Sequence, residues 1–276
     1  MPEIVEAEVI VNYLKKRLLG QKIIKINILN KTSFIGNPKK VINNKINKIE
    51  RLGKKILFQL DNLSLLFHLK MTGQLIYFDK KVFNSKNFKK DLKYARVIFF
   101  FDKDVLLFND IRKFGFVLVL KDSDLLKEKQ KLGIDPLSEE FNFSFLKHSL
   151  SKSKKNIKNF LMDQKYISGL GNIYVNESLF LSKIHPQSLS YKIPERKIKD
   201  LLFAIKKVLK EGLKREGSSI NSYVKPDLTK GEYQNNFLVY KREGERCLFC
   251  KKSMILRIKI SQRSSFYCPQ CQKKFL

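Results

Sequence analysis

The stretch Cys247-Leu-Phe-Cys250, matched further on by Cys268-Pro-Gln-Cys271, decides how the end of this chain folds. It contains all four cysteines of the sequence, as two pairs with two residues inside each pair. Two thiolates three positions apart at a tight turn can face the same ion, and two such turns complete the tetrahedral sulfur shell that Zn²⁺ prefers. The spacing therefore predicts a zinc site, with a pair of disulfides or four unrelated buried cysteines as the alternatives.

The segment between the two cysteine pairs predicts a β-hairpin. Side chains alternate in character over residues 254–260 and again over residues 264–267, and Arg263 falls near the tip. A closed four-cysteine site leaves no coordination position for water or substrate, so its metal is structural. We expect one structural Zn²⁺ that stiffens the hairpin.

The composition indicates a polyanionic partner. The 276 residues are enough for one large domain or two ordinary ones, and 56 lysines and arginines against 26 aspartates and glutamates give a net charge of +30. Such an excess favours nucleic-acid binding, although a codon bias towards lysine would also raise it. No basic amphipathic helix dominates, no signal peptide is evident, and the apolar runs are too short to span a bilayer. We therefore expect a cytoplasmic protein with no membrane partner.

The order of hydrophobic patterns predicts an α+β chain of two domains. An amphipathic helix covers residues 1 to about 20, with Pro2 as an ordinary helix start. Short β-like segments then alternate with Gly, Asn and Asp, as in a β-sandwich. The expected strands are 22–29, 54–60, 64–69, 74–78, 94–101, 105–109 and 116–120, and the expected helices are 144–149, 157–164, 172–183 and 194–216. The predicted domains are a β-sandwich at 1–122, a linker at 123–143, a helical domain at 144–236, and the zinc hairpin at 237–276.

Gly169-Leu-Gly171-Asn172 directly precedes an apolar helix. Glycines permit a tight turn, and the free backbone N–H groups at a helix start can hold a phosphate. A simple capped helix is the plainer interpretation, because Gly-X-Gly-Asn alone is a weak signal.

Five segments together resemble the formamidopyrimidine-DNA glycosylase family of bacterial base-excision repair. They follow the family's order along the whole chain. The segments are Met1-Pro-Glu3, Phe67-His-Leu-Lys-Met-Thr-Gly73, Asp110-Ile-Arg-Lys-Phe-Gly115, Gly169-Leu-Gly-Asn-Ile-Tyr-Val-Asn-Glu-Ser-Leu-Phe180 and Gln262-Arg-Ser-Ser-Phe-Tyr-Cys-Pro-Gln-Cys-Gln272. The resemblance implies a helix-two-turn-helix in the helical domain, damaged double-stranded DNA as the partner, a monomer, and a bacterial, nucleoid-associated location.

The resemblance gives four residues catalytic roles. After removal of Met1, the secondary amine of Pro2 would attack the sugar C1′ of a damaged nucleotide and form a Schiff base. An α-amino group has a reference pKa near 8, so an appreciable neutral fraction exists at neutral pH. Glu3 matches the general acid/base, Lys54 the proton donor in β-elimination, with Lys55 as its neighbour, and Arg263 the arginine that grips a phosphate and assists δ-elimination.

Further residues match DNA contacts of the family. The enzyme must turn the damaged nucleotide out of the stack and fill the hole it leaves. Met71, Arg112 and Phe114 match the void-filling residues, although read alone Met71 and Phe114 would be core residues. The matched DNA-binding residues are Tyr94, Arg112, Lys154, Lys158 and Asn172, and the matched lid over the everted base is the loop at about 217–231, with Ser218, Ser219 and Tyr223.

Three positions depart from the family pattern without removing a catalytic group. Val5 stands where proline is usual, Lys70 where glycine is common, and Tyr94 where histidine is common. The resemblance predicts a bifunctional glycosylase and apurinic/apyrimidinic (AP) lyase for 8-oxoguanine and formamidopyrimidines. The alternatives are an endonuclease VIII-like enzyme for oxidised pyrimidines, which the void-filling set opposes, and a non-catalytic zinc-ribbon protein that binds nucleic acid.

Overall fold

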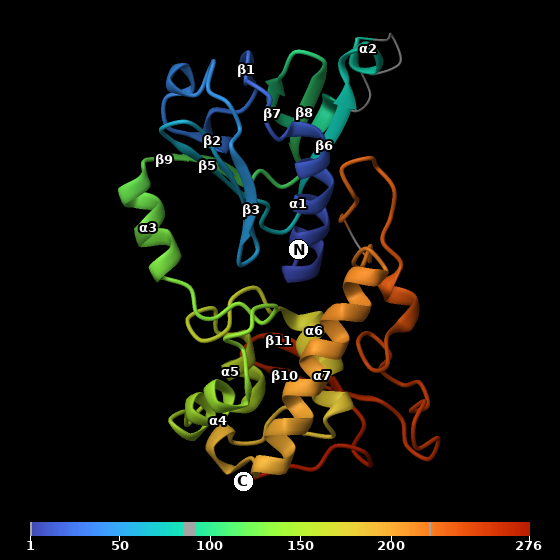
Figure 1. Cartoon of the computed structure of the whole chain (residues 1–276). Coiled ribbons are helices and arrows are strands. Elements are labelled where there is room, and N and C mark those ends of the chain that lie inside the picture. Colours follow the sequence, from blue (N-terminus) through green and yellow to red (C-terminus); the bar gives the residue numbers. More distant parts are fainter. Residues whose placement is uncertain (1, 85–91, 221) are drawn as a thin grey trace. The chain divides into compact units, whose positions relative to one another are not determined.

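The computed structural model describes residues 2–84, 92–220 and 222–276 and divides into two compact units (Figure 1). The first unit comprises Met1–Gln130 with Arg215–Glu232, and the second comprises Lys131–Lys214 with Tyr233–Leu276. The segment Arg215–Glu232 includes the lid loop, which we expected within the helical domain. It instead belongs to the sheet-containing unit, although it follows the helices in sequence.

The first unit starts with helix α1 (Ile4–Leu18). Ile4, Val5, Ile10 and Leu14 are buried on its apolar side, while Lys15, Lys16 and Arg17 occupy the last turn, where cations favour the negative end of the helix dipole. The helix packs against β3 and β4. The start of α1 is therefore fixed to the sheet by burial.

Two sheets form the rest of the first unit. One has the strand order β1-β7-β8-β6 and the other β2-β9-β5-β4-β3, and all neighbours are antiparallel except the β2 and β9 pair. The strands are β1 (Lys25–Ile28), β2 (Phe34–Ile35), β3 (Lys48–Leu52), β4 (Lys55–Gln59), β5 (Ser64–His68), β6 (Gly73–Asp79), β7 (Ala95–Phe100), β8 (Asp104–Asp110) and β9 (Phe116–Leu120). Short helices α2 (Lys80–Phe83) and α3 (Asp122–Gln130) flank them.

The core of this unit draws on both sheets and on α1. Phe67 of β5 lies between Phe58 of β4 and Phe99 of β7, with ring centroids 4.8 and 5.6 Å away. All three rings are at most 1% exposed, so the two sheets are joined by close aromatic packing. This is the predicted β-sandwich with a leading helix.

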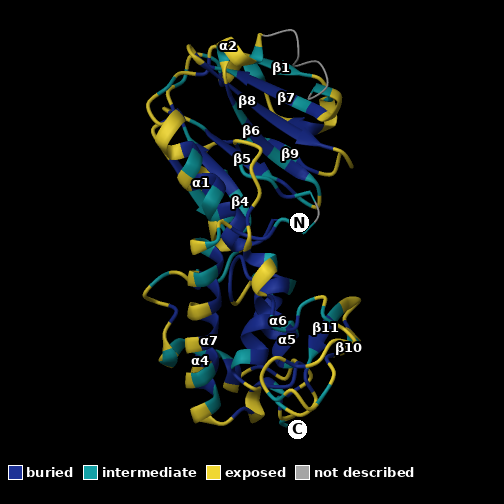
Figure 2. Ribbon diagram, turned by 90° about the vertical axis from the view of Figure 1, so that its right-hand side faces the viewer, coloured by how far each residue is buried: buried dark blue, intermediate teal, exposed yellow. Residues whose placement is uncertain are grey.

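The second unit is helical. It contains α4 (Phe143–Ser151), α5 (Ile157–Met162), α6 (Asn172–Leu181) and α7 (Glu195–Lys214). Helix α6 is buried on nearly every side, whereas α7 is exposed along one face (Figure 2). Helix α6 is therefore the central element of this unit.

A two-stranded hairpin completes the second unit. Strand β10 (Leu256–Ile260) pairs with β11 (Arg263–Tyr267), and Ile260 lies opposite Arg263. The two turn residues, Ser261 and Gln262, both have positive φ, at 46° and 64°, as a type I′ turn requires. The predicted hairpin with Arg263 at its tip is confirmed.

The sequence prediction lacked the short elements β2 and α2 as well as β3 and α3. Strand β3 was missing from the expected strands, and α3 occupies the start of the range expected to be a linker.

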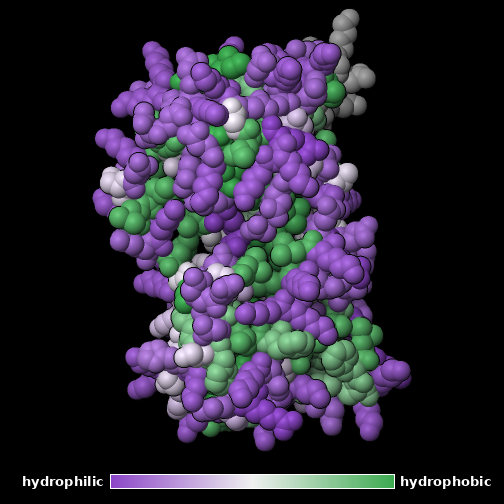
Figure 3. Space-filling model, viewed as in Figure 1, coloured by the Kyte–Doolittle hydropathy of each residue, from purple (hydrophilic) through white to green (hydrophobic). Residues whose placement is uncertain are grey.

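Hydrophilic side chains cover most of the face shown in Figure 3 on both units. Among the described residues, no helix is both long and apolar enough to cross a membrane.

Candidate functional site

The start of α1 is anchored by a buried carboxylate. Pro2 and Glu3 are buried, and the Glu3 N–H donates to the Glu6 carboxylate at 2.8 Å. The other Glu6 oxygen accepts from the Ser218 N–H at 2.9 Å. Glu6, itself 1% exposed, thus joins the predicted general acid Glu3 to the predicted lid. Met1, whose removal we expected, lies outside the described residues.

The lid residues pack against the rest of the first unit. Gly217 has φ +82°, and a Cβ there would lie 3.0 Å from Glu6. Ser219 Oγ accepts from the Gly231 N–H at 2.9 Å, which closes the base of the loop. Tyr223 is 5% exposed in the sandwich core, and burial raises the pKa of its phenol. In this structure the lid is fastened at its base and through Tyr223.

The predicted void-filling side chains project into solvent. Met71 is 44% exposed and Phe114 is 55% exposed, so neither is the core residue that its type alone would suggest. The Arg112 guanidinium lies 4.8 Å from the centroid of the Phe114 ring, at cation–π distance. These are rigidly mounted apolar and cationic groups available to an external partner.

One buried carboxylate connects the two loops that bear these side chains. Asp110 Oδ2 accepts from the Gly115 N–H at 2.7 Å. Its Oδ1 accepts from the Arg112 N–H at 3.2 Å and from the Thr72 hydroxyl. In addition, Ser222 Oγ donates to the Met71 carbonyl at 3.0 Å, which attaches the lid to the same loop.

Lys54 lies at the tight turn between β3 and β4, beside Gly53 with φ +62°. The Arg51 guanidinium donates to Glu8 of α1 at 2.8 Å and to the Gly53 carbonyl at 3.1 Å, so this turn is fixed relative to α1. Lys55 forms an ion pair with Glu128 at 2.5 Å. Lys55 therefore has a structural partner in α3.

His68 was absent from the predicted site, although it lies three residues before Met71. Burial, followed by the nearby charges of Lys70, Lys55 and Lys54, lowers its pKa to about 4. The Lys70 N–H donates to His68 Nδ1 at 3.2 Å, so the neutral ring carries its proton on Nε2. The predicted contact Tyr94, just before β7, is 37% exposed.

In the second unit, two predicted phosphate ligands point to the hairpin instead. Lys158 is fully buried, and its Nζ donates to the Ser264 carbonyl at 2.7 Å and to Ser265 Oγ at 2.6 Å. Asn172 Nδ2 donates to the same carbonyl at 3.1 Å. A fully buried ammonium cannot bind phosphate without leaving these partners, so in this structure Lys158 braces the residue that follows Arg263.

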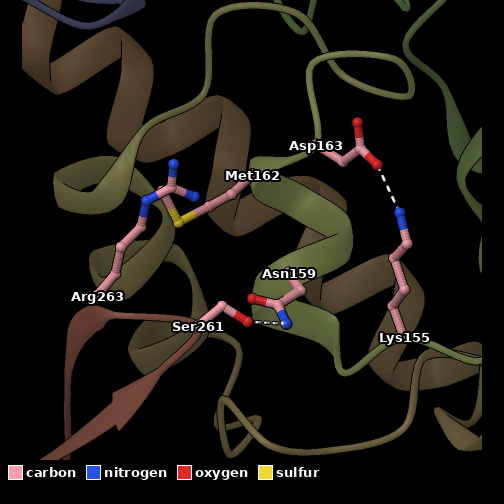
Figure 4. A pocket seen from close by; sticks show the side chains of 6 residues that line it. All are labelled: Lys155, Asn159, Met162, Asp163, Ser261 and Arg263. Atoms are coloured by element: carbon pink, nitrogen blue, oxygen red, sulfur yellow. Dashed lines mark hydrogen bonds and ion pairs between the residues drawn. The ribbon is translucent and has the colours of Figure 1, made fainter.

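A pocket of about 350 Å³ lies beside the hairpin tip. Arg263 and Ser261 come from the hairpin, and the remaining lining residues come from α5 and its flanks (Figure 4). Asn159 Nδ2 donates to Ser261 Oγ at 2.8 Å, and the ion pair with Asp163 raises the pKa of Lys155. Lys154 is exposed nearby in sequence. Exposed cations around a concave surface are suited to phosphate contact.

The four cysteine sulfurs lie within 4.8 Å of one another. Cys247 and Cys271 are 3.8 Å apart at sulfur, and Cys250 and Cys268 are 3.7 Å apart. Four sulfurs about 2.3 Å from a tetrahedral zinc would be separated by about 3.8 Å. The cysteines therefore fit a single structural zinc ion, as predicted, rather than two disulfides.

The buried carboxylate of Glu177 in α6 was also missing from the predicted site. It accepts from the N–H groups of Leu238, Val239 and Tyr240 at 2.8 to 3.0 Å, and burial raises its pKa. It thereby fixes the chain as it enters the zinc-binding segment. The sequence signal was an acidic residue at the centre of an otherwise apolar helix, which is seldom buried without partners.

Comparisons with known proteins cover nearly the whole chain. Family profiles match the formamidopyrimidine-DNA glycosylase N-terminal domain at residues 1–117, the H2TH domain of the same enzymes at 132–224, and the zinc finger found in FPG and IleRS at 244–274. A formamidopyrimidine-DNA glycosylase from Wolbachia pipientis subsp. Culex pipiens (strain wPip) is 36% identical, over 99% of this chain and 100% of the relative. One from Lactobacillus gasseri is 36% identical, over 99% of each chain.

Solved structures agree with these relatives. Lactococcus lactis Fpg in complex with DNA containing an abasic site has a TM-score of 0.87 at 33% identity, over 99% of this chain and 100% of that one. The wild-type Lactococcus lactis protein bound to DNA containing N7-benzyl-Fapy-dG has a TM-score of 0.88 at 33% identity, with the same coverage. The likeness therefore extends over both units and the hairpin.

Proposed function

This chain belongs to the formamidopyrimidine-DNA glycosylase family, and from that premise we propose how its own residues perform the reaction. It is a DNA glycosylase for oxidised purines in duplex DNA, with the AP lyase activity typical of the family. The observation that carries this conclusion is the full-length match to such enzymes together with the retained Pro2 and Glu3. We place the enzyme in the bacterial cytoplasm at the nucleoid, where its substrate is.

Pro2 supplies the nucleophile. Its neutral secondary amine attacks C1′ of the everted nucleotide, the bond from C1′ to the base breaks, and the base departs with a proton. Pro2 directly precedes Glu3, the N-cap of α1. Glu6 positions this end of the helix through the Glu3 N–H.

Glu3 and Lys54 move protons. The carboxyl group of Glu3 donates to the sugar ring oxygen as the ring opens, which leaves an iminium between Pro2 and C1′. The Glu3 carboxylate left by ring opening can then take the proton from C2′, and the 3′ phosphate leaves in β-elimination with Lys54 as its proton donor. Arg51 and Glu8 hold the turn that carries Lys54 in place.

The second unit binds the DNA backbone. Arg263 grips a phosphate from the hairpin tip and assists δ-elimination, while Lys154 adds an exposed positive charge. Asn172 stands at the start of the buried helix α6, where backbone N–H groups favour an anion. The zinc ion, when bound, supplies only rigidity, because four thiolates close its coordination shell.

Borohydride trapping tests the assignment of Pro2. The mature protein should form a covalent adduct with duplex DNA that contains 8-oxoguanine. A variant with Gly-Ser placed before Pro2 turns the amine into an amide, so it should bind the same DNA but form no adduct. Mass spectrometry verifies both N-termini. An equal adduct yield from the extended variant, or faster release of thymine glycol than of 8-oxoguanine by the mature enzyme, contradicts the proposal.

A further inference from the structure

The two loops that bear Met71, Arg112 and Phe114 share a single interior support. Asp110 ends β8, faces Gly73 across the strand pair, and is 0% exposed. Its carboxylate is the hydrogen-bond acceptor at the centre of both loops. A buried carboxylate is retained only where donors satisfy it, and here these donors come from both loops.

Both oxygens of the Asp110 carboxylate accept hydrogen bonds. Oδ2 accepts from the Gly115 N–H at 2.7 Å, which closes the four-residue loop 111–114. Oδ1 accepts from the Arg112 N–H at 3.2 Å and from the hydroxyl of Thr72, the neighbour of Met71. The Arg112 N–H also lies 3.2 Å from Thr72 Oγ1. One side chain thus sets the position of both loops relative to each other.

The backbone of each loop is strained, so each needs such support. Lys70, directly before Met71, has φ +50°, and Lys113, between Arg112 and Phe114, has φ +59°. Residues with a Cβ rarely adopt this conformation, and they keep it only where surrounding contacts fix it. The Asp110 contacts provide that fixation on both sides.

The space around the carboxylate is also closed. A Cβ at Gly115 would lie 3.1 Å from Asp110 Oδ2 and 2.8 Å from the Phe108 ring. A water molecule therefore has no room to replace the Gly115 N–H donor on that side. The loop therefore closes tightly around the Asp110 carboxylate.

We infer that Asp110 is a positioning residue for base eversion: it presents Met71 on one loop and Arg112 with Phe114 on the other as one preassembled wedge. The inference rests on the proposed function, because the wedge is useful only to an enzyme that turns a nucleotide out of duplex DNA. Wedge side chains must offset a few kcal/mol of lost stacking and pairing. Two loops that moved independently would have to be ordered at the moment of eversion, which would slow it.

Asp110→Asn tests the inference with little change in shape. The amide places an N–H group towards either the Gly115 or the Arg112 N–H, so one donor loses its acceptor. The rate of eversion, followed by stopped-flow fluorescence of 2-aminopurine beside an 8-oxoguanine, should fall by roughly tenfold to a hundredfold. Borohydride trapping by Pro2 on a single-stranded abasic oligonucleotide needs no wedge and should remain within about twofold of wild type.

Asp104→Asn is the matched control. Asp104 begins the same strand, is 7% exposed, and accepts hydrogen bonds from Tyr77 and Gln21. Its substitution disturbs a buried carboxylate of the same unit without touching either loop, so eversion should stay within about twofold of wild type. Thr72→Val should slow eversion and Thr72→Ser should restore it, because serine keeps the hydroxyl.

Each result that contradicts the expectation leads to a different conclusion. If Asp110→Asn everts the base at the wild-type rate while Met71→Ala is slow, the inference about Asp110 is wrong and the proposed function stands. If the Asp110 and Asp104 variants slow eversion equally, or if single-stranded trapping falls by the same factor, the effect is general destabilisation and the inference is overturned. If Met71→Ala leaves eversion unchanged, the proposed wedge fails, and the task assigned to Asp110 fails with it.

Discussion

The two units hold their predicted DNA-contacting groups by chemically opposite means. In the first, buried carboxylates, Glu6 and Asp110, accept hydrogen bonds from backbone N–H groups of the loops. In the second, a buried ammonium, Lys158, donates to the Ser264 carbonyl of the hairpin, and four thiolates bind a metal. A carboxylate suits loops whose backbone N–H groups need an acceptor, and an ammonium suits a hairpin whose carbonyl needs a donor.

The difference also reflects how much core each segment has. The loops of the first unit grow from a sandwich whose core includes α1 and both sheets, so local hydrogen bonds are enough to position them. The hairpin of β10 and β11 is a two-stranded ribbon, which is marginal by itself in water. It therefore depends on the zinc and on packing against α6, to which Phe266 is tied by its N–H donating to Asn176.

Removal of zinc should produce the largest difference in behaviour between the two units. We expect Cys268→Ser to lose zinc and to bind a duplex with an abasic-site analogue at least about a hundredfold more weakly, because the hairpin that carries Arg263 loses its support. Pro2 should still form a trapped adduct with single-stranded abasic DNA. Elemental analysis and fluorescence anisotropy measure the two quantities. Normal duplex binding by the zinc-free protein would refute the dependence.

Lys158→Met should show that the buried Lys158 has a different role from lysines on the surface. Ser265 Oγ then loses the hydrogen bond from Lys158, while the Ser264 carbonyl still accepts from Asn172. The free energy of unfolding should therefore fall by about 1–3 kcal/mol. Guanidinium denaturation measures it.

The control is Lys154→Met, at an exposed position. It should change stability by less than about 0.5 kcal/mol but lower the slope of log Kd against log salt by about 1. The reverse pattern, with Lys154 stabilising the fold and Lys158 governing the salt slope, would show that Lys158 leaves the interior to bind phosphate.

His68 should make the first unit sensitive to acid in a defined window. Its pKa is lowered to about 4 by burial, so the stabilisation by the neutral ring is complete above pH 6.5 and is lost as the pH falls from 6.5 towards 4. After allowance for the partly exposed ring, His68→Gln should remove about 1–2 kcal/mol of the stability difference between pH 7 and pH 4.5. An unchanged difference in denaturant titrations would mean that His68 does not titrate in this range.

Lys70→Gly should give the smallest effect, and a favourable one. Lys70 has φ +50°, a conformation that costs a residue with a side chain about 1 kcal/mol relative to glycine. We expect a gain in stability of up to about 1 kcal/mol, reduced by the lost contact of its ammonium with the Phe116 ring at 5.6 Å. Thermal unfolding tests this. A loss of stability would show that the side-chain contact outweighs the backbone strain.

The sequence predicted the elements whose pattern is local. Cysteine spacing led to the zinc and to a hairpin with Arg263 at its tip, and alternation led to most strands of the sandwich. Strand β3 was missed because Lys48-Ile-Glu-Arg-Leu52 is mostly charged. It forms an edge of its sheet, where charged residues are usual because they discourage pairing with other chains.

The rest depended on contacts between residues far apart in sequence. Nothing local to Ile157-Lys158-Asn159 distinguishes a buried brace from a surface phosphate ligand, since the partner of Lys158 is 106 residues away. Nothing near Glu6 in the sequence likewise indicates its partner, the Ser218 N–H, which is 212 residues away. Helix α3 was missed because only Leu125 is buried in it.

The position of Arg215–Glu232 in the first unit has a consequence for biosynthesis. The sandwich begins to emerge from the ribosome first, yet its last segment follows roughly 85 residues after Gln130. At about 5–20 residues per second, this is a delay of roughly 4–17 s. During that interval the surface that receives Tyr223 is uncovered, and Glu6 awaits the Ser218 N–H. The nascent chain therefore carries an incomplete N-terminal unit until most of the helical unit has been synthesised.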